Sequence, residues 1–311
     1  MPAQRFEKYP RRPKGRRFAS PAALGPWTLL APALAILLAM TIAPAIYLFY
    51  ASFRHENLLG PGSSFVGLQN FTRALTNPEI WWDWLATIQF VAIAVTIEIL
   101  LGLTLALMLS AKLSERNLLL ALYILPLGVA PVVSALTFRV LLNPTYGWVD
   151  FYLQRWGLIG QPIDWLGQPL TAWIAIIALD VWQWTPFVTL ILLAALSAVP
   201  AEPRAAALLD GATATALFWR IIFPFIRPFI AIAVVLRSIE AFKTFGSIFV
   251  LTGGGPGAST EIINLSLYRI ALQNFDIGAA AALGLIFLLL LSLIMSQLLR
   301  LLGRNTDILE E

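Results

Sequence analysis

The chain contains no cysteine and a single histidine, and only 12% of its 311 residues are charged. The missing thiols exclude disulfides, iron–sulfur clusters and thiolate metal sites. The histidine, His55, follows the first long apolar run, where a surface residue is a better interpretation than a metal ligand. The glycine-rich run 253–257 lacks the Gly-Lys-Ser/Thr ending of a phosphate-binding loop. We therefore expect no catalytic residue, no metal site and no cofactor in this chain.

Apolar residues dominate instead: 59% of the chain is hydrophobic and the mean hydropathy is +0.79, far outside the usage of soluble domains. A helix needs roughly 20 apolar residues to span a bilayer. Windows of that kind lie near residues 26–52, 84–109, 118–142, 169–198, 224–250 and 277–303. Prolines within them, such as Pro126 and Pro131, are tolerated where neighbouring helices satisfy the freed backbone groups. The sequence predicts an all-α membrane protein with six transmembrane helices.

Lys and Arg set the orientation, because cytoplasmic segments next to spans carry the excess of these residues. Seven of them lie in the tail before the first span: Arg5, Lys8, Arg11, Arg12, Lys14, Arg16 and Arg17. If that tail is inside, the outer loops hold only Arg54, Arg73, Arg155 and Arg269. We expect both termini to be cytoplasmic, with tails over 1–25 and 304–311 and a transmembrane domain over 26–303.

A basic tail beside a first span is also a site for anionic lipid, and this interpretation is preferred over a nucleic-acid arm. The outer segment from Trp148 to Trp156 is rich in aromatic residues. It is typical of a helix lying at the membrane interface. We therefore expect membrane lipid as a partner and no nucleic acid.

A segment rich in small residues and partly charged, about 200–223, separates the fourth and fifth windows. Alanines and leucines from Glu202 to Leu209 favour a helix, and Gly211 ends it because glycine adopts positive φ without steric cost. A second short helix would then present Leu217, Phe218, Ile221 and Ile222 as an apolar stripe for a partner's groove. The segment predicts a helix, a sharp turn and a second helix.

This segment resembles the EAA signature of ABC importer permeases, the loop that docks on the cytoplasmic ATPase. The positions that carry the resemblance and its ATPase-coupling role are Ala205, Ala206, Ala207, Asp210, Gly211, Ala212, Phe218, Ile221 and Pro224. The glutamate of the signature falls at Ala205, and Glu202 is the nearest carboxylate. We therefore expect this subunit to hold its ATPase mainly by apolar contact, with a second permease subunit contributing the stronger polar contact.

The resemblance extends to the carbohydrate-uptake branch, the permeases of maltose-, trehalose- and glycerol-phosphate-type importers. Segments 65–71, 125–126 and 251–256 support it. It implies a type I ABC importer (MetI-like) permease fold in the cell inner membrane. It also implies a transport subunit, not an enzyme, that works with a second and different permease subunit and two ATPase subunits that bind ATP and Mg. An extracytoplasmic solute-binding protein would deliver a sugar or related polyol.

Charged residues inside spans are expensive and mark a path or a paired structural site. Two polar faces lie at similar depth: one in the fourth window and one in the fifth. Carbohydrate permeases place sugar contacts on these helices, which makes the candidate substrate path Asp180, Gln183, Trp184, Phe187, Arg237, Glu240, Ala241 and Thr244. The alternative is a buried Arg237–Glu240 pair, with Asp180 or Lys243, that only locks helices together.

Glu98 in the second window has no partner in its own helix, so we expect it to contact a partner subunit rather than to relay protons. Two other functions compete with the permease. A secondary transporter without an ATPase would need internal repeats or discontinuous helices around ion ligands. A membrane-embedded enzyme has only Asp180 and Glu240 as a candidate reactive pair.

Overall fold

The computed structural model describes residues 26–60, 62–110 and 116–303. The two tails predicted to be cytoplasmic, 1–25 and 304–311, lie outside the described residues. The chain divides into two compact units, Met1–Tyr47 and Leu48–Glu311, and each is described by itself.

The first unit is formed, in its described part, by most of α1 (Pro26–Ser52), whose last turn belongs to the second unit. The stretch Leu30–Ser52 is long and apolar enough to cross a membrane. Pro32 and Pro44 lie inside this helix without ending it.

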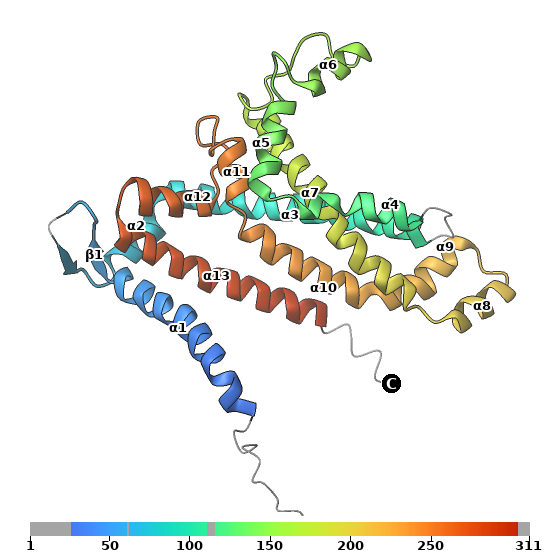
Figure 1. Cartoon of the computed structure of the whole chain (residues 1–311), viewed down its shortest axis with the longest axis horizontal. Helices are drawn as coiled ribbons and strands as arrows, with labels where there is room; N and C mark the ends of the chain where they lie inside the picture. Colours follow the sequence, from blue (N-terminus) through green and yellow to red (C-terminus); the bar gives the residue numbers. More distant parts are fainter. Residues whose placement is uncertain (1–25, 61, 111–115, 304–311) are drawn as a thin grey trace, which may run out of the picture. The chain divides into compact units, whose positions relative to one another are not determined.

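The second unit is almost entirely helical (Figure 1). Its only described strands, β1 (Arg54–Glu56) and β2 (Ser63–Phe65), form an antiparallel hairpin. Its helices are α2 (Gln69–Thr76), α3 (Pro78–Ser110), α4 (Arg116–Tyr123), η1 (Leu125–Gly128), α5 (Pro131–Leu141), α6 (Trp148–Arg155), α7 (Pro169–Ser197), α8 (Ala201–Leu209), α9 (Ala214–Leu217), η2 (Phe218–Ile222), α10 (Phe223–Phe242), α11 (Gly246–Leu251), α12 (Ile263–Tyr268), η3 (Arg269–Gln273) and α13 (Ile277–Gly303). η1 is a 3₁₀-helix, and η2 and η3 are π-helices.

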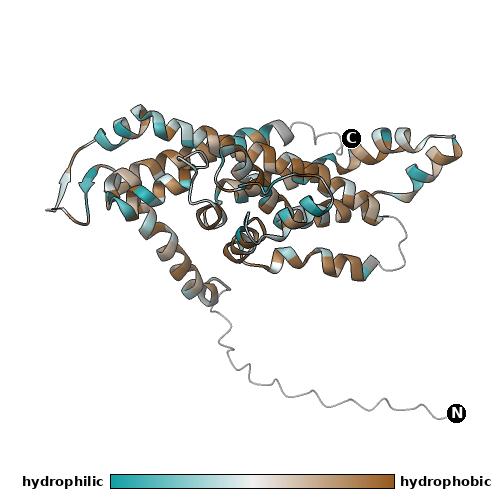
Figure 2. Ribbon diagram, turned by 90° about the horizontal axis from the view of Figure 1, so that it is seen from above, coloured by the Kyte–Doolittle hydropathy of each residue, from teal (hydrophilic) through white to brown (hydrophobic). Residues whose placement is uncertain are grey.

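The core of this unit lies between its four longest helices. α3 packs along α7, and α10 packs against α3, α7 and α13. Phe90, Ile176, Leu179 and Leu283 are among its fully buried side chains. The same helices carry mainly hydrophobic residues along their length (Figure 2), as helices do that face lipid as well as each other.

Six transmembrane helices were expected, and five described helices are long and apolar enough to cross a membrane: Leu30–Ser52, Pro78–Ser110, Pro169–Ser197, Ala214–Phe242 and Ile277–Arg300. The remaining window, 118–142, is divided into α4, η1 and α5. Pro126 and Pro131 explain the division, because each lacks an N–H donor and disfavours helical geometry in the residue before it. Ala130 is accordingly extended, at φ −61° and ψ 135°.

The helix of the fifth window also begins and ends at other residues than the composition predicts. Helical structure begins at Ala214, before Pro224, and ends at Phe242 rather than near 250. The amide of Asn264 donates to the carbonyls of Phe242 and Thr244, at 2.8 and 2.9 Å, and so satisfies acceptors at the end of α10. α11 then starts as a separate helix that packs on α5.

Candidate functional site

The segment between α7 and α10 folds as the sequence predicts, into a helix, a sharp turn and a second helix. α8 ends at Leu209 with Asp210 as its C-cap residue, and Gly211 follows at φ +77°. The amide of Ala212 donates to the carbonyl of Ala207 at 2.9 Å, which closes the turn. Thr213 caps α9, because its hydroxyl accepts from the amide of Ala216 at 3.2 Å. We call residues 200–223 the coupling segment.

The coupling segment has a largely exposed surface, and neither α8 nor α9 contains a buried residue. Of the positions singled out in the sequence, Ala205, Ala206, Asp210, Gly211 and Pro224 are exposed, and Ala207, Ala212, Phe218 and Ile221 are half-buried. The predicted apolar stripe is half-buried, and Ile222 packs on the core.

The coupling segment does expose large apolar side chains, but they are not those of the predicted stripe. Leu209 is 90% exposed, Leu208 59% and Trp219 58%. Our sequence reasoning missed them. The sequence did contain a signal for two of them: Leu208 and Leu209 are the only large apolar residues of the helix that they end. They provide the apolar area that a partner could cover.

A helical connection leads from this segment into the core. α9, η2 and α10 follow one another without a break from Ala214 to Phe242. The π-turn lies directly before Pro224, whose missing N–H disturbs the regular α-helical hydrogen bonds. The second half of the coupling segment and Arg237 therefore lie on one continuous helical stretch.

Arg237 lies at the junction of three long helices and is fully buried. Its Nε is 2.6 Å from Oε2 of Glu98 on α3, and its Nη2 donates to Oε1 of the same carboxylate at 3.0 Å. Nη2 also forms an ion pair with Asp180 on α7. Glu98 is fully buried, and Asp180 is 6% exposed. We call Glu98, Asp180 and Arg237 the buried triad; it joins α3, α7 and α10.

Trp184 lies against this triad, with its ring centroid 4.9 Å from the guanidinium carbon of Arg237. Nη1 of Arg237 has no hydrogen-bond acceptor among the described residues, and the ring gives the guanidinium a stabilising cation–π contact. Trp184 and Phe187 are half-buried and meet edge to face at 6.3 Å. Gln183 is buried and donates to the carbonyl of Val129 at 2.8 Å.

The structure separates the candidate path residues of α10. Ala241 is buried on the same side as Arg237, whereas Glu240 is exposed and pairs with Lys243 at 2.7 Å. Thr244 lies just beyond the helix. The Arg237–Glu240 pair considered as an alternative is therefore replaced by two separate sets of ion pairs. Glu98 has its partner within this chain, a contact that our sequence reasoning missed because 139 positions separate the two residues.

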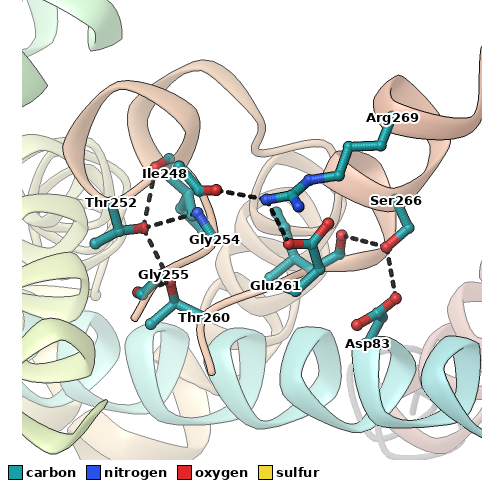
Figure 3. Close-up of polar contacts among 11 residues, drawn as sticks. Asp83, Ile248, Thr252, Gly254, Gly255, Thr260, Glu261, Ser266 and Arg269 are labelled. Carbon is teal, nitrogen blue, oxygen red and sulfur yellow. Dashed lines mark hydrogen bonds and ion pairs between the residues drawn. The ribbon is translucent and has the colours of Figure 1, made fainter. Parts of the chain in front are cut away.

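A second polar network joins α3 to the loop between α11 and α12 (Figure 3). Arg269 donates to the carbonyl of Gly253 at 2.7 Å and pairs with Glu261 at 2.9 Å. Ser266 donates to Asp83 of α3 at 2.5 Å. Burial raises the pKa of Glu261, while the nearby Arg269 opposes that rise. This network anchors the glycine-rich loop on α3.

Gly254 is required at the centre of that loop. Its φ is +88°, and an added Cβ would lie against the Glu261 carboxylate and 3.0 Å from Nη2 of Arg269. The sequence marked this glycine run as a loop without nucleotide chemistry, and the structure gives it a packing role.

Comparison with known proteins places these features in a family. Residues 98–308 match the family "Binding-protein-dependent transport system inner membrane component". The chain is 38% identical over 267 residues to the trehalose/maltose transport system permease protein MalF of Thermococcus litoralis, covering 86% of this chain and 90% of that protein. It is 32% identical over 264 residues to the trehalose transport system permease protein SugA of Mycobacterium tuberculosis, covering 83% and 82%.

The fold has a solved counterpart. A chain of a bacterial ABC transporter involved in the import of the acidic polysaccharide alginate superposes with a TM-score of 0.79. The match covers 90% of this chain and 95% of that one at 23% identity. It confirms the expected ABC importer permease fold.

The buried triad generates a stability prediction. Glu98→Gln leaves Arg237 with one carboxylate fewer, so we expect the free energy of unfolding to fall by about 3–5 kcal/mol. Glu240→Gln removes an exposed ion pair and is expected to cost less than about 1 kcal/mol. Chemical unfolding of the full chain in nanodiscs measures both. Equal losses in the two variants would contradict a structural role for the triad.

The glycine loop generates a second prediction. Gly254→Ala forces a side chain into a positive-φ position and against the Arg269–Glu261 pair, so we expect a lower unfolding temperature. Gly257→Ala is the matched control, because Gly257 has φ +56° and open space around its Cβ position. It should show only the backbone strain, about 1 kcal/mol. A Gly254→Ala chain as stable as the control would show that crowding of the ion pair has no effect.

Proposed function

Because the chain belongs to the family of binding-protein-dependent transport system inner membrane components, we propose that it is the permease subunit of an ATP-driven sugar importer. In this function it forms half of a transmembrane pore. The family membership favours it over a secondary transporter or a membrane-embedded enzyme.

The exposed coupling segment is the observation that carries the proposal. It presents Leu208, Leu209 and Trp219 next to the Gly211 turn, and it continues directly into the helix that holds Arg237. Apolar residues on a short, rigid helical turn suit the groove of a partner protein. We infer that this partner is a cytoplasmic ATPase subunit, that both chain termini lie on its side, and that Ala205–Ala207, Asp210, Gly211 and Ala212 form part of the contact.

The remaining partners follow from the same function. Two ATPase subunits would bind ATP and Mg, and a second permease chain would complete the pore. An extracytoplasmic solute-binding protein would deliver the substrate. We infer a sugar or polyol because MalF of Thermococcus litoralis and SugA of Mycobacterium tuberculosis are named for trehalose and maltose transport.

The substrate path would run beside the buried triad. Trp184 and Phe187 are half-buried, so part of each ring remains available. A sugar packs its C–H face on such rings while its hydroxyls make hydrogen bonds. Asp180 and Arg237 would hold this surface in place from beneath, and Glu240 and Thr244 would lie near its end.

Transport would proceed by a rigid movement. Closure of the ATPases would displace the coupling segment, and the continuous helix from α9 to α10 would carry that displacement to Arg237. Because Arg237 is ion-paired to α3 and α7, the three helices would tilt together. The pore would then change from inward-facing to outward-facing.

Gly211→Asp tests the coupling. We expect sugar uptake and sugar-stimulated ATP hydrolysis to be lost while the chain stays inserted, because a charged side chain would project into the ATPase contact. The measurement is uptake and ATP hydrolysis by the reconstituted transporter. Gly157→Asp is the control, since Gly157 also has positive φ, +69°, and open space around it but lies after α6. Normal uptake by the Gly211→Asp transporter would refute the coupling assignment.

Trp184→Ala tests the substrate path. Loss of the ring should lower sugar uptake about tenfold or more, since an aromatic face contributes about 1 kcal/mol or more to stacking in addition to its buried area. Binding of the solute-binding protein should not change. Trp182→Ala is the control, because Trp182 lies on another face of α7 and packs on Phe138. Equal uptake by the two variants would place the path elsewhere.

A further inference from the structure

Two adjacent cavities lie where the first turns of α3 meet α12 and the loop before it. Their volumes are about 540 and 330 Å³, within the range of small-molecule sites. Four residues line both cavities: Trp82, Asp83, Ala258 and Glu261. Two of them, Asp83 and Glu261, belong to the polar network of Figure 3, and none of the four is part of the buried triad.

The polar groups at these cavities are held in fixed positions. Asp83 is 9% exposed and accepts from Ser266, and Glu261 is 6% exposed and pairs with Arg269. The hydroxyl of Ser259, in the smaller cavity, is buried and has no hydrogen-bond partner among the described residues. A buried hydroxyl without a partner is costly, which favours a ligand that supplies one.

The apolar part of the cavities is aromatic. Trp82 borders both cavities and is 69% exposed, unlike the buried Trp84 two positions on, and Trp173 borders the smaller cavity. The indole of Trp173 is held by a hydrogen bond to the carbonyl of Ser259 at 2.9 Å. Aromatic rings beside fixed carboxylates and a hydroxyl without a hydrogen-bond partner match the C–H face and the hydroxyl groups of a sugar.

The charged residues that line the cavities indicate the charge of a ligand that would fit. Asp83 and Glu261 line both cavities, and Glu79 lines the larger one. Arg269, which also lines the larger cavity, is the one basic residue among all the residues that line them. Arg269 is already bound by Glu261 and the Gly253 carbonyl. An anionic ligand would meet net negative charge without an available cation.

We propose that these two cavities form an entry subsite that binds an uncharged sugar before it reaches Trp184. The proposal rests on the proposed function, which places this end of α3 on the extracytoplasmic side. Trp82 would stack on the sugar ring, and Asp83 and Glu261 would accept hydrogen bonds from its hydroxyls.

The test reads the subsite directly. The full chain, labelled with fluorotryptophan and held in nanodiscs, is titrated with trehalose, glucose and glucuronate while its fluorine NMR spectrum is followed. Trp82→Phe identifies the Trp82 signal among the eleven tryptophans. We expect that signal to shift saturably with trehalose or glucose but not with glucuronate. Glu261→Gln should raise the half-saturating concentration about tenfold, because one hydrogen bond to a charged group is weakened.

Uptake by the complete reconstituted transporter separates this proposal from the permease function. Trp82→Ala should lower uptake several-fold, whereas Trp156→Ala, which removes a tryptophan of similar exposure (68%) elsewhere, should not. If the wild type imports sugar but the Trp82 signal does not respond, the subsite is refuted and the permease function stands. An equal response to glucuronate, or loss of the response in the assembled transporter, also overturns it. A wild type that imports no sugar refutes the proposed function instead.

Discussion

The arrangement of the long helices depends on the ion pairs of Arg237 with Glu98 and Asp180. Burying an unpaired charge costs several kcal/mol, so the two carboxylates and the guanidinium stabilise one another in their buried positions. Each comes from a different helix, and their contact therefore fixes how α3, α7 and α10 lie against one another. Apolar packing alone would specify this less strictly, because helices in a membrane gain little from apolar contact over lipid. The triad gives the bundle a single register.

The ion pairs of the triad hold three helices together, whereas the irregular helical turns lie elsewhere in the chain. The prolines of the third window divide it into α4, η1 and α5, and Pro224 follows a π-turn between the coupling segment and α10. Neither irregularity lies within the part of the bundle that the triad ties together. In the proposed transport cycle, changes of angle would occur at the divided third window, while the helical stretch from α9 to α10 carries the displacement and α3, α7 and α10 move as one body. The start of α3 is held by a second set of polar contacts: Ser266 donates to Asp83, and Arg269 binds Glu261 and the glycine loop.

Composition was sufficient for the fold class, and local chemistry was sufficient for the coupling segment, because a helix–Gly–helix pattern depends on residues close together in the chain. Long-range pairing was not accessible in the same way. Arg237 and Glu240 share a helix at a spacing that suggests a local pair, but Lys243 has the same spacing from Glu240 and is exposed with it. Arg237 is instead buried beside a carboxylate 139 positions away. Prolines were an ambiguous signal. The helix α1 continues through Pro32 and Pro44, whereas the window that contains Pro126 and Pro131 is divided into α4, η1 and α5.

The distribution of charge in the second unit also bears on what can pass through it. Near the end of α10, Arg237 is ion-paired with two carboxylates and Lys243 with Glu240, so the positive charge of each side chain is already compensated by carboxylates of this chain. The groups beside the triad that remain partly exposed are the aromatic rings of Trp184 and Phe187. Such surfaces distinguish ligands by shape and hydrogen bonding rather than by charge. The alginate importer, whose substrate is an acidic polysaccharide, shares this fold, so the fold itself does not select charge. Selection must come from the side chains of each chain, and in the proposed path of this subunit the ion pairs that hold the helices together also compensate the charge of Arg237.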